Sequence, residues 1–358
     1  MRKRNVFFRL VFAVLLIPAV LLVSGVLLMS CDRYGLRGRI VRFEQEMESY
    51  RAETNNVGLV VVFVRNYEVA YMQHWGELDE DQLIRVASIS KTFTATGLMQ
   101  LVEKGVLRTD MDASDLLGYR LRNPQYPDRV ITLEMLMSHT SSVNARERYN
   151  DYAPGEGYQY CDYNYTLCGE ILERASGEPF DTYIREHILR PMQIAGDFQS
   201  DSLDRSRLAH LYQWEDDHYE CTDEWAYDAR VSPASGMKIS AKDLTRYMLM
   251  HMRHGLAANG VRILSDSLSR EMQKPRSYQG AEHYGLGLLE TEMFSPGTVL
   301  TGHSAGAYGM RGVMYFRADE GYGFIVLSNG SHDPQHDDEN MVHFGTIRRM
   351  FDCFAGEE

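Results

Sequence analysis

A serine and a lysine three residues apart, Ser88 and Lys91, form the pair in this chain that could most directly do covalent chemistry. Residues 93–102 are mostly apolar, with Gln100 expected to face out, and Gly105 follows as a stop signal. This pattern predicts a helix that begins at the pair, and residues three apart share one helix face. A lysine amine can activate a serine hydroxyl when burial lowers its pKa, and a helix start offers backbone N–H groups to a developing oxyanion. The spacing also occurs by chance, so its meaning depends on the motifs that accompany it.

The composition indicates a folded, acidic protein. Of the 358 residues, 44% are hydrophobic, which is enough for a sizeable core. The net charge is -13, from 37 basic and 50 acidic residues, and nothing outside the N-terminus resembles a basic tract. We therefore expect no nucleic-acid partner.

The N-terminus differs in character from the rest of the chain. Basic residues at positions 2, 3, 4 and 9 precede an apolar run at 10–29, which exceeds the apolar part of most secretory signals and approaches a membrane span. Residues 1–31 are therefore predicted to be a signal or a membrane anchor, and residues 28–31 also resemble a lipoprotein cleavage box that would place a lipid on Cys31. Because the basic flank is expected to stay in the cytoplasm, either interpretation predicts a membrane-tethered, extracytoplasmic domain in the periplasm or at the cell surface.

The five cysteines show no pattern of metal ligands or paired disulfides. Their spacing is irregular, so we expect most of them to be free thiols. The polar stretch at residues 332–338 contains two histidines and three aspartates, and we interpret it as a loop and not as a metal site. No metal or organic cofactor is predicted.

Strand patterns at both ends of the domain enclose a region of helical patterns. Residues 57–71 are expected to form a hairpin that turns at Arg65-Asn66. The other expected elements are helices at 37–54, 240–254 and 339–354, strands at 284–289, 298–302, 313–316 and 323–327, and a loop over the site at 208–230. This order predicts an α/β domain from residue 36 to 358, in which one lobe (about 36–110 and 230–358) carries an inserted helical lobe (about 111–229).

Five motifs, the first of which contains Ser88, follow one another along the chain in a recognisable order. They are 85–93, 131–141, 154–162, 233–237 and 302–306. Through them the chain resembles the serine β-lactamase-like hydrolases: penicillin-binding proteins, class C β-lactamases, D-Ala-D-Ala carboxypeptidases and related esterases. The resemblance extends over about residues 57–351. It implies a β-lactamase/transpeptidase-like fold, with an antiparallel sheet of five or more strands flanked by helices.

The resemblance also implies roles for individual residues. Ser88 would be the nucleophile, and Lys91 and Tyr160 would share the proton transfers, with Tyr160 at the tyrosine of the family's Tyr-x-Asn motif. A phenol acts as a base only if cations hold it as phenolate, which Lys91 would do with help from a protonated His303. The backbone N–H groups of Ser88 and Gly306 would form the oxyanion hole.

Three positions depart from the family pattern. Asp162 replaces the usual asparagine and could pair with Lys91, His303 replaces the lysine of Lys-Thr-Gly, and Ala305 replaces the glycine of that motif. A neutral imidazole holds a carboxylate less well than an ammonium does. We therefore expect poor β-lactamase activity, and Arg311 is a candidate to hold a substrate carboxylate, against the alternative of a solvated arginine.

Two further residues are weighed against simpler interpretations. His139 is expected to be structural, bonding the loop backbone. Tyr158 is the tyrosine that we expect to line the substrate cleft, whereas packing accounts for most of the other tyrosines between 149 and 165.

Together these patterns predict an exported serine hydrolase that cleaves an amide or ester of a small peptide-like, peptidoglycan-derived molecule. A D-Ala-D-Ala carboxypeptidase or D-amino-acid peptidase ranks ahead of an esterase, and a weak β-lactamase ranks third. The alternative of another class is a catalytically silent protein that binds peptidoglycan fragments. The complete set of Ser88, Lys91 and Tyr160 argues against it, and Asp162 and Ala305 favour it.

Overall fold

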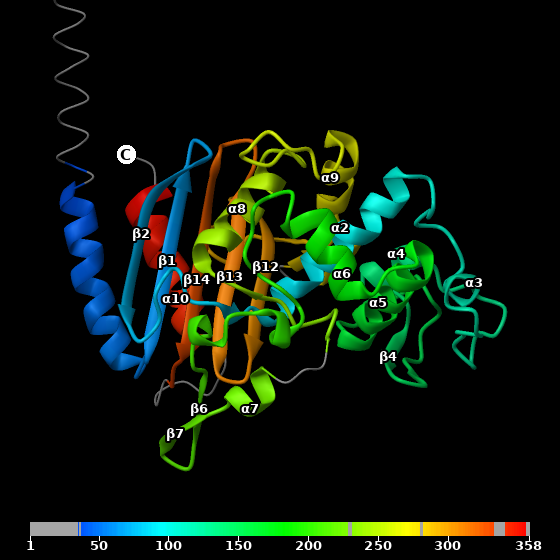
Figure 1. Ribbon diagram of the computed structural model, residues 1–358, viewed down its shortest axis with the longest axis horizontal. Helices are drawn as coiled ribbons and strands as arrows, with labels where there is room; N and C mark the ends of the chain where they lie inside the picture. Colours follow the sequence, from blue (N-terminus) through cyan, green and yellow to red (C-terminus); the bar gives the residue numbers. More distant parts are fainter. Residues whose placement is uncertain (1–34, 36, 228–230, 280–281, 333–340, 356–358) are drawn as a thin grey trace, which may run out of the picture.

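An antiparallel sheet of eight strands runs through the larger part of the molecule (Figure 1). The structure is a computed structural model that describes residues 35, 37–227, 231–279, 282–332 and 341–355. The sheet confirms the prediction of five or more antiparallel strands, and its order is β2-β1-β14-β13-β12-β11-β10-β9. The strands are β1 (Gly58–Arg65), β2 (Glu68–Gly76), β9 (Ser277–Gln279), β10 (Glu282–Tyr284), β11 (Leu289–Thr291), β12 (Leu300–Ala307), β13 (Met310–Arg317) and β14 (Tyr322–Gly330).

Helices cover both faces of this sheet, with α8 on one side and α10 on the other (Figure 1). The helical segments are residues 37–53, η1 (Ala87–Ile89), α2 (Ser90–Glu103), α3 (Ala113–Leu117), α4 (Leu133–Met137), α5 (Asp162–Ser176), α6 (Phe180–Ile184), η2 (Arg185–Leu189), η3 (Ser200–Ser202), η4 (Arg205–Arg207), α7 (Asp223–Ala226), α8 (Ala241–Met252), α9 (Asp266–Gln273), α10 (Met341–Met350) and η5 (Phe351–Ala355). The helices expected at 37–54, 240–254 and 339–354 are thus confirmed where the structure describes them. Ser240 caps α8 by accepting the N–H of Asp243.

Burial of both faces explains why β1 is apolar throughout. Leu59, Val61 and Phe63 pack against helix 37–53 and α10, whereas the alternate residues of β1 pack with α8 and α2. Side chains alternate along a strand, so a strand covered on both sides needs apolar residues at every position. The continuous run in the sequence is therefore a property of the sheet's two covered faces.

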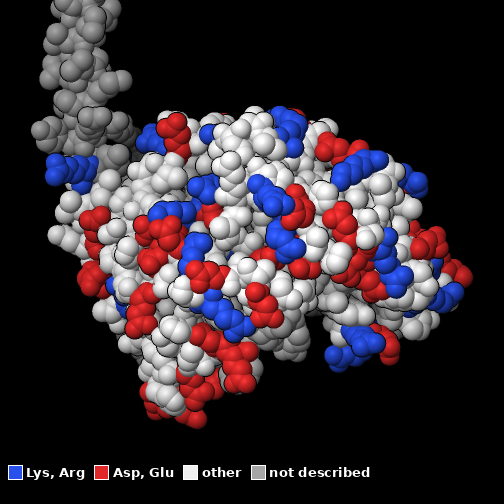
Figure 2. All heavy atoms as spheres, in the orientation of Figure 1, with Lys and Arg blue, Asp and Glu red and all other residues white. Residues whose placement is uncertain are grey.

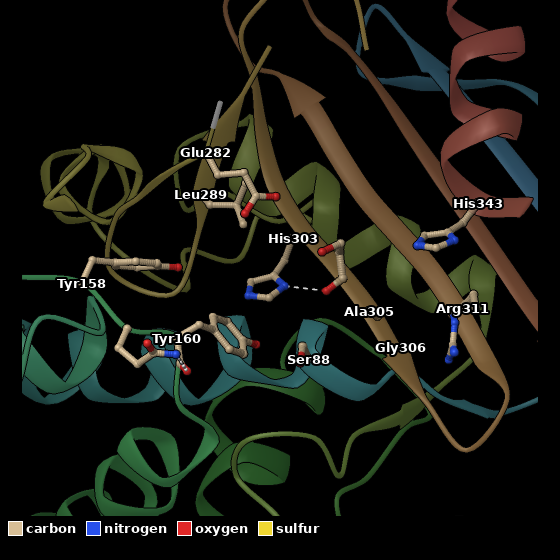
Figure 3. Close-up of a pocket in the computed structure, with 12 residues that line it drawn as sticks. Ser88, Tyr158, Tyr160, Glu282, Leu289, His303, Ala305, Gly306, Arg311 and His343 are labelled. Atoms are coloured by element: carbon tan, nitrogen blue, oxygen red, sulfur yellow. Dashed lines mark hydrogen bonds between the residues drawn. The ribbon is translucent and has the colours of Figure 1, made fainter. Parts of the chain in front are cut away.

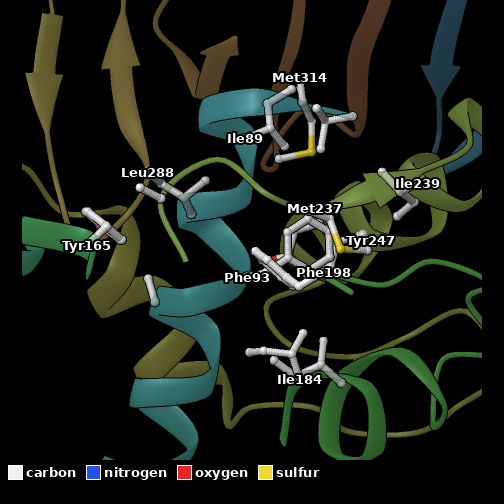
Figure 4. Close-up of a cluster of buried hydrophobic side chains, with 14 of the residues drawn as sticks. Ile89, Phe93, Tyr165, Ile184, Phe198, Met237, Ile239, Tyr247, Leu288 and Met314 are labelled. Atoms are coloured by element: carbon white, nitrogen blue, oxygen red, sulfur yellow. The ribbon is translucent and has the colours of Figure 1, made fainter. Parts of the chain in front are cut away.

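Helix α2, which follows Ser88, passes through the hydrophobic core on the α8 side of the sheet (Figure 4). Phe93 stacks on Tyr247 of α8 with ring centroids 3.7 Å apart. Gln100, expected to face out, is only 8% exposed, because its side-chain amide donates to the carbonyl oxygens of His187 and Ile263. An internal helix leaves no outward face, so polar groups on it need partners of this kind.

Three local predictions need correction. The first hairpin turns at Asn66 and Tyr67, with φ of 53° and 60°, one residue later than expected. The strand expected at 284–289 is divided, since β10 ends at Tyr284 and the chain turns through Gly287 (φ 83°) before β11. The region 208–230 is not one loop: it contains a second hairpin, β6 (Tyr212–Glu215) with β7 (His218–Cys221), followed by α7.

The remaining strands form short pairs beside the main sheet. They are β3 (Ile84–Arg85) with β8 (Lys238–Ile239) and β4 (Val143–Ala145) with β5 (Arg148–Tyr149). Figure 2 shows that the face of the molecule seen in Figure 1 carries charges of both signs, and that acidic side chains gather over the β6–β7 hairpin. The lobe boundaries proposed from the sequence stay a prediction.

The predicted anchor at 1–31, including Cys31, lies outside the described residues, and so does most of the polar stretch at 332–338. Across the segments that the structure describes, we find no helix with the length and apolar character needed to cross a membrane. The four described cysteines are free thiols, namely Cys161, Cys168, Cys221 and Cys353.

Candidate active site

Ser88 lies in a tight turn between β3 and α2 that other segments hold in place. Ala87, the residue before it, has a φ of 40°, which is costly for a residue other than glycine and is maintained only by strong surroundings. Ser90 supplies part of that support, because its hydroxyl accepts the backbone N–H of Met237 at 2.9 Å. Ser88 is thus presented on a locally strained turn.

Lys91 is fully buried beneath Ser88 and reaches its hydroxyl. The Lys91 Nζ lies 3.0 Å from Ser88 Oγ, 2.9 Å from the carbonyl oxygen of Ala234 and 2.6 Å from Asp162 Oδ1. Burial lowers the pKa of Lys91, while the carboxylate of Asp162 acts in the opposite direction. The predicted pairing of Asp162 with Lys91 is confirmed, although the Asp162 side chain is 63% exposed.

Arg85 is a supporting residue that the sequence reasoning missed. Its guanidinium donates to the carbonyl oxygens of Ser235 (2.9 Å) and Ala226 (2.7 Å) and lies over the ring of Tyr308. Arg85 thereby positions the turn that contains Ala234, the acceptor for Lys91. An arginine between the apolar neighbours Ile84 and Val86 is the signal that could have revealed it, because a buried arginine requires several acceptors.

Tyr160 lies between Lys91 and the open side of the site. Its ring centroid is 4.8 Å from Lys91 Nζ, and Tyr160 lines the same cavity as Ser88. The residue is 36% exposed, and Figure 3 shows its side chain pointing toward Ser88. Burial first, and then the negative charge of Asp162, raise the pKa of Tyr160. The phenol is therefore held protonated, contrary to the phenolate that the resemblance suggested.

His139 holds the backbone that carries Tyr160, as predicted for a structural histidine. Its Nδ1 accepts the N–H of Cys161 at 3.2 Å, and its ring lies against Tyr160 with centroids 4.4 Å apart. Asn164 of α5 extends this support, since its amide contacts His139 Nδ1 at 3.3 Å and accepts a hydrogen bond from Ser141.

His303 on β12 is neutral, which corrects the idea that a protonated imidazole helps to hold a phenolate. Burial and the charge of Lys91 lower the pKa of His303 to about 3. Its Nδ1 lies 2.6 Å from the carbonyl oxygen of Ser304, so this nitrogen carries the proton and Nε2 accepts from the hydroxyl of Tyr284 at 2.9 Å. The structure gives His303 a fixed tautomer and no charge.

These groups meet at a cavity of about 540 Å³ (Figure 3). The predicted residues Ser88, Tyr158, Tyr160, His303 and Arg311 all line it. Lys91 and Asp162 act from behind this lining, through their contacts with Ser88 and with each other. The full lining is Ser88, Tyr158, Gln159, Tyr160, Glu282, Leu289, His303, Ser304, Ala305, Gly306, Arg311 and His343.

The β12 edge brings Ala305 and Gly306 beside Ser88. Gly306 is paired with Arg311 in the β12–β13 register. The side chain of Arg311 therefore reaches the cavity from β13, the strand next to β12. The oxyanion hole formed by the N–H groups of Ser88 and Gly306 stays a prediction. Glu282 and His343 were missed because β10 and α10 bring them here from segments with no motif of their own.

One group in the described part of the chain has donor atoms close enough to hold a metal ion. It consists of His210, Cys221 and Asp223, whose atoms lie within 4.8 Å of one another. Asp223 already pairs with His210 at 2.6 Å and accepts the N–H of Leu211 at 2.9 Å, and none of the three lines the cavity. The carboxylate of Asp223 therefore already has partners within the protein, and we interpret it as a structural contact that holds the segment beside the β6–β7 hairpin.

Solved structures of other proteins share this fold. A D-stereospecific amidohydrolase from Streptomyces sp. aligns with a TM-score of 0.71 and 21% identity, over 88% of this chain and 98% of its own. A D-amino acid amidase from Ochrobactrum anthropi SV3, complexed with L-phenylalanine amide, aligns with a TM-score of 0.73 and 18% identity, over 89% and 98% of the two chains. At these identities the likeness establishes the fold, which is the predicted β-lactamase/transpeptidase-like one.

Sequence comparison identifies the family directly. Penicillin-binding protein 4 of Amycolatopsis lactamdurans is 28% identical over 222 residues, which cover 54% of this chain and 57% of that protein. The chain spans about half the length of the curated relatives it matches. A family model described as Beta-lactamase matches residues 43–344, which include Ser88, Tyr160 and the β12 edge. The chain therefore belongs to the beta-lactamase family of serine hydrolases.

Proposed function

We propose that this protein hydrolyses amide bonds of small peptide-like molecules through an acyl-enzyme on Ser88, as a D-Ala-D-Ala carboxypeptidase or D-amino-acid peptidase would. The observation that carries the proposal is the 3.0 Å contact between Lys91 Nζ and Ser88 Oγ at a cavity of about 540 Å³. That volume suits a short peptide. The D-stereospecific amidohydrolase and D-amino acid amidase that share the fold support this substrate class.

The pKa directions assign the proton transfers. Lys91, whose pKa burial lowers, accepts the proton of Ser88 as the oxygen bonds to the substrate carbonyl carbon. The ammonium that forms is stabilised by Asp162 and by the carbonyl oxygen of Ala234. Tyr160 donates its proton to the leaving amine as the carbon–nitrogen bond breaks, and it regains a proton from Lys91. Water then attacks the acyl carbon as Lys91 takes its proton, the bond between that carbon and Ser88 Oγ breaks, and Lys91 returns the proton to Oγ as the acid leaves.

Arg311 gives the cavity a cationic group where the family's lysine is replaced by neutral His303. A guanidinium can hold a carboxylate with two parallel hydrogen bonds. We therefore assign a substrate carboxylate to Arg311, which is consistent with a carboxypeptidase-like activity. We also propose that the domain lies outside the cytoplasm and is tethered by residues 1–31, because residues 10–29 form an apolar run behind a basic flank.

Intact-mass analysis of the domain from residue 36 to 358 tests the proposed function. A fluorophosphonate probe is expected to add one adduct to the wild-type domain and none to Ser88→Ala. Hydrolysis of D-Ala-D-Ala peptides is then compared with hydrolysis of short acyl esters and of benzylpenicillin. Failure to label Ser88 would support a binding protein without turnover, and rapid ester cleavage with no peptide cleavage would support an esterase.

Asp162→Asn is expected to move the acid limb of the kcat/KM profile to lower pH. Lys91 must be neutral to accept the proton of Ser88, so activity falls as the pH drops through the pKa of Lys91. The carboxylate of Asp162 raises that pKa, and its removal lowers it. The variant should therefore outperform the wild type on the acid side of the profile. Asp151→Asn, which removes an exposed carboxylate from the neighbouring loop, is the control. An unmoved limb would contradict Lys91 as the base.

A further inference from the structure

Glu282 is a carboxylate in the cavity for which the proposed mechanism has no use. It lies on β10, is half-buried and lines the same cavity as Ser88. Among the described residues its carboxylate has no hydrogen-bond or ion-pair partner, and the groups that feel its charge are the phenols of Tyr158, Tyr160 and Tyr315. Partial burial of a carboxylate without a partner is costly, which suits a group whose partner is a ligand.

The charges around Ser88 are divided between two ends of the cavity. Within the described lining, Glu282 is the one carboxylate and Arg311 the one guanidinium. Figure 3 shows them on different sides of Ser88, with Glu282 above and to the left and Arg311 to the right. His303 is neutral and has a pKa of about 3, and burial together with the charge of Arg311 lowers the pKa of His343 in the same way.

The other acid near the nucleophile is not available to a ligand in the same way. The carboxylate of Asp162 lies 2.6 Å from Lys91 Nζ, so it already has a hydrogen-bonding partner within the protein. A substrate that carries an ammonium group would therefore find its uncompensated counter-charge at Glu282. A substrate carboxylate would find its counter-charge at Arg311, at the other end.

We propose that Glu282 forms a subsite for a primary ammonium group of the substrate, so that the enzyme selects peptides or amides with a free amine. The inference rests on the proposed hydrolase function and deepens it. A zwitterionic substrate would lie with its ammonium at Glu282, its scissile carbonyl over Ser88 and its anionic end toward Arg311. A substrate with a blocked amine would leave Glu282 half-buried and unpaired, which weakens its binding.

Matched substrates that differ only at the amine test this subsite. D-alanine 4-nitroanilide and its N-acetyl form serve for turnover, and the wild type is expected to prefer the free amine. Glu282→Gln should reduce kcat/KM for the free amine by about 10- to 100-fold, the usual range for losing a charged hydrogen bond, and leave the N-acetyl form nearly unchanged. Glu282→Lys should reverse the preference toward an N-succinyl substrate.

Glu290 offers the matched control. It lies half-buried on the neighbouring strand β11, burial raises its pKa as it does that of Glu282, and it is not part of the cavity lining. Glu290→Gln should leave both substrates unaffected. If wild type and Glu282→Gln show the same ratio between the two substrates while Ser88 still reacts with fluorophosphonate, the subsite is overturned and the hydrolase function stands.

A binding measurement separates the two proposals further. In a Ser88→Ala background, calorimetry with D-Ala-D-Ala and N-acetyl-D-Ala-D-Ala needs no turnover. Tighter binding of the free amine that Glu282→Gln abolishes would support the subsite even in a protein whose Ser88 does not react. Equal binding of the two peptides would overturn it, whatever the outcome for catalysis.

Discussion

Replacing Lys91 with methionine is expected to slow acylation of Ser88 by about three orders of magnitude, the middle of the range for loss of a general base. Methionine keeps the length of the lysine stem but has no amine. The Lys91 side chain is fully buried 3.0 Å from Ser88 Oγ, so no solvent group can take its place at that distance. The rate of labelling by a fluorophosphonate, followed by intact mass, measures the effect directly.

The fold should survive this change, which keeps the prediction interpretable. Asp162, the ion-pair partner of Lys91, is 63% exposed and can be hydrated when the ammonium is lost. An apolar side chain in a fully buried position also avoids the desolvation of an amine, so we expect the melting temperature to stay level or rise. Lys104→Met, at the exposed end of the same helix, is the control. Acylation within tenfold of wild type would show that Ser88 loses its proton to another group.

The proximity of Ser88, Lys91 and Asp162 could be predicted because local sequence determines much of their spacing. Ser88 and Lys91 lie on consecutive helical turns, and Tyr160 and Asp162 flank the start of α5, so short motifs keep each pair together. The β1–β2 hairpin was predicted for the same reason, and only its turn was misplaced by one residue. Local periodicity carries this information whatever the rest of the chain does.

The charge states of these residues could not be predicted, because distant segments determine them. His303 is neutral because burial and the charge of Lys91, which comes from helix α2, lower the pKa of its ring. Tyr160 keeps its proton because burial and the negative charge of Asp162 raise the pKa of its phenol. A motif supplies the residue types, whereas the pKa depends on what the fold packs around them.

Long-range packing also explains the residues that were missed or misplaced. Glu282 and His343 reach the cavity from β10 and α10, and no motif connects these segments with Ser88. Gln100 has the polarity of a surface residue, yet the carbonyl oxygens of His187 and Ile263 give it partners inside the protein. Polarity alone cannot distinguish a solvated side chain from a buried one with partners.

Tyr160→Phe is expected to affect amides far more than activated esters. The change removes the hydroxyl and keeps the ring that packs on His139 and lies over Lys91. If the protonated phenol supplies the proton to a leaving amine, peptide and amide hydrolysis should fall by about 10²- to 10³-fold. A 4-nitrophenyl ester releases a leaving group that needs no proton, so its hydrolysis should fall by less than about tenfold.

The ratio of the two losses distinguishes the roles that Tyr160 could have. A phenolate base would act when Ser88 attacks, before the leaving group matters, so its removal would slow amide and ester acylation alike. The raised pKa of Tyr160 and the neutral state of His303 both argue for the unequal result. Tyr158→Phe, in the same cavity, is the control and should change both substrates to a similar, small extent. Equal losses of amide and ester hydrolysis in Tyr160→Phe would show that the phenolate of Tyr160, and not Lys91, is the base. The carboxylate of Asp162 would then oppose catalysis, because its negative charge disfavours the phenolate.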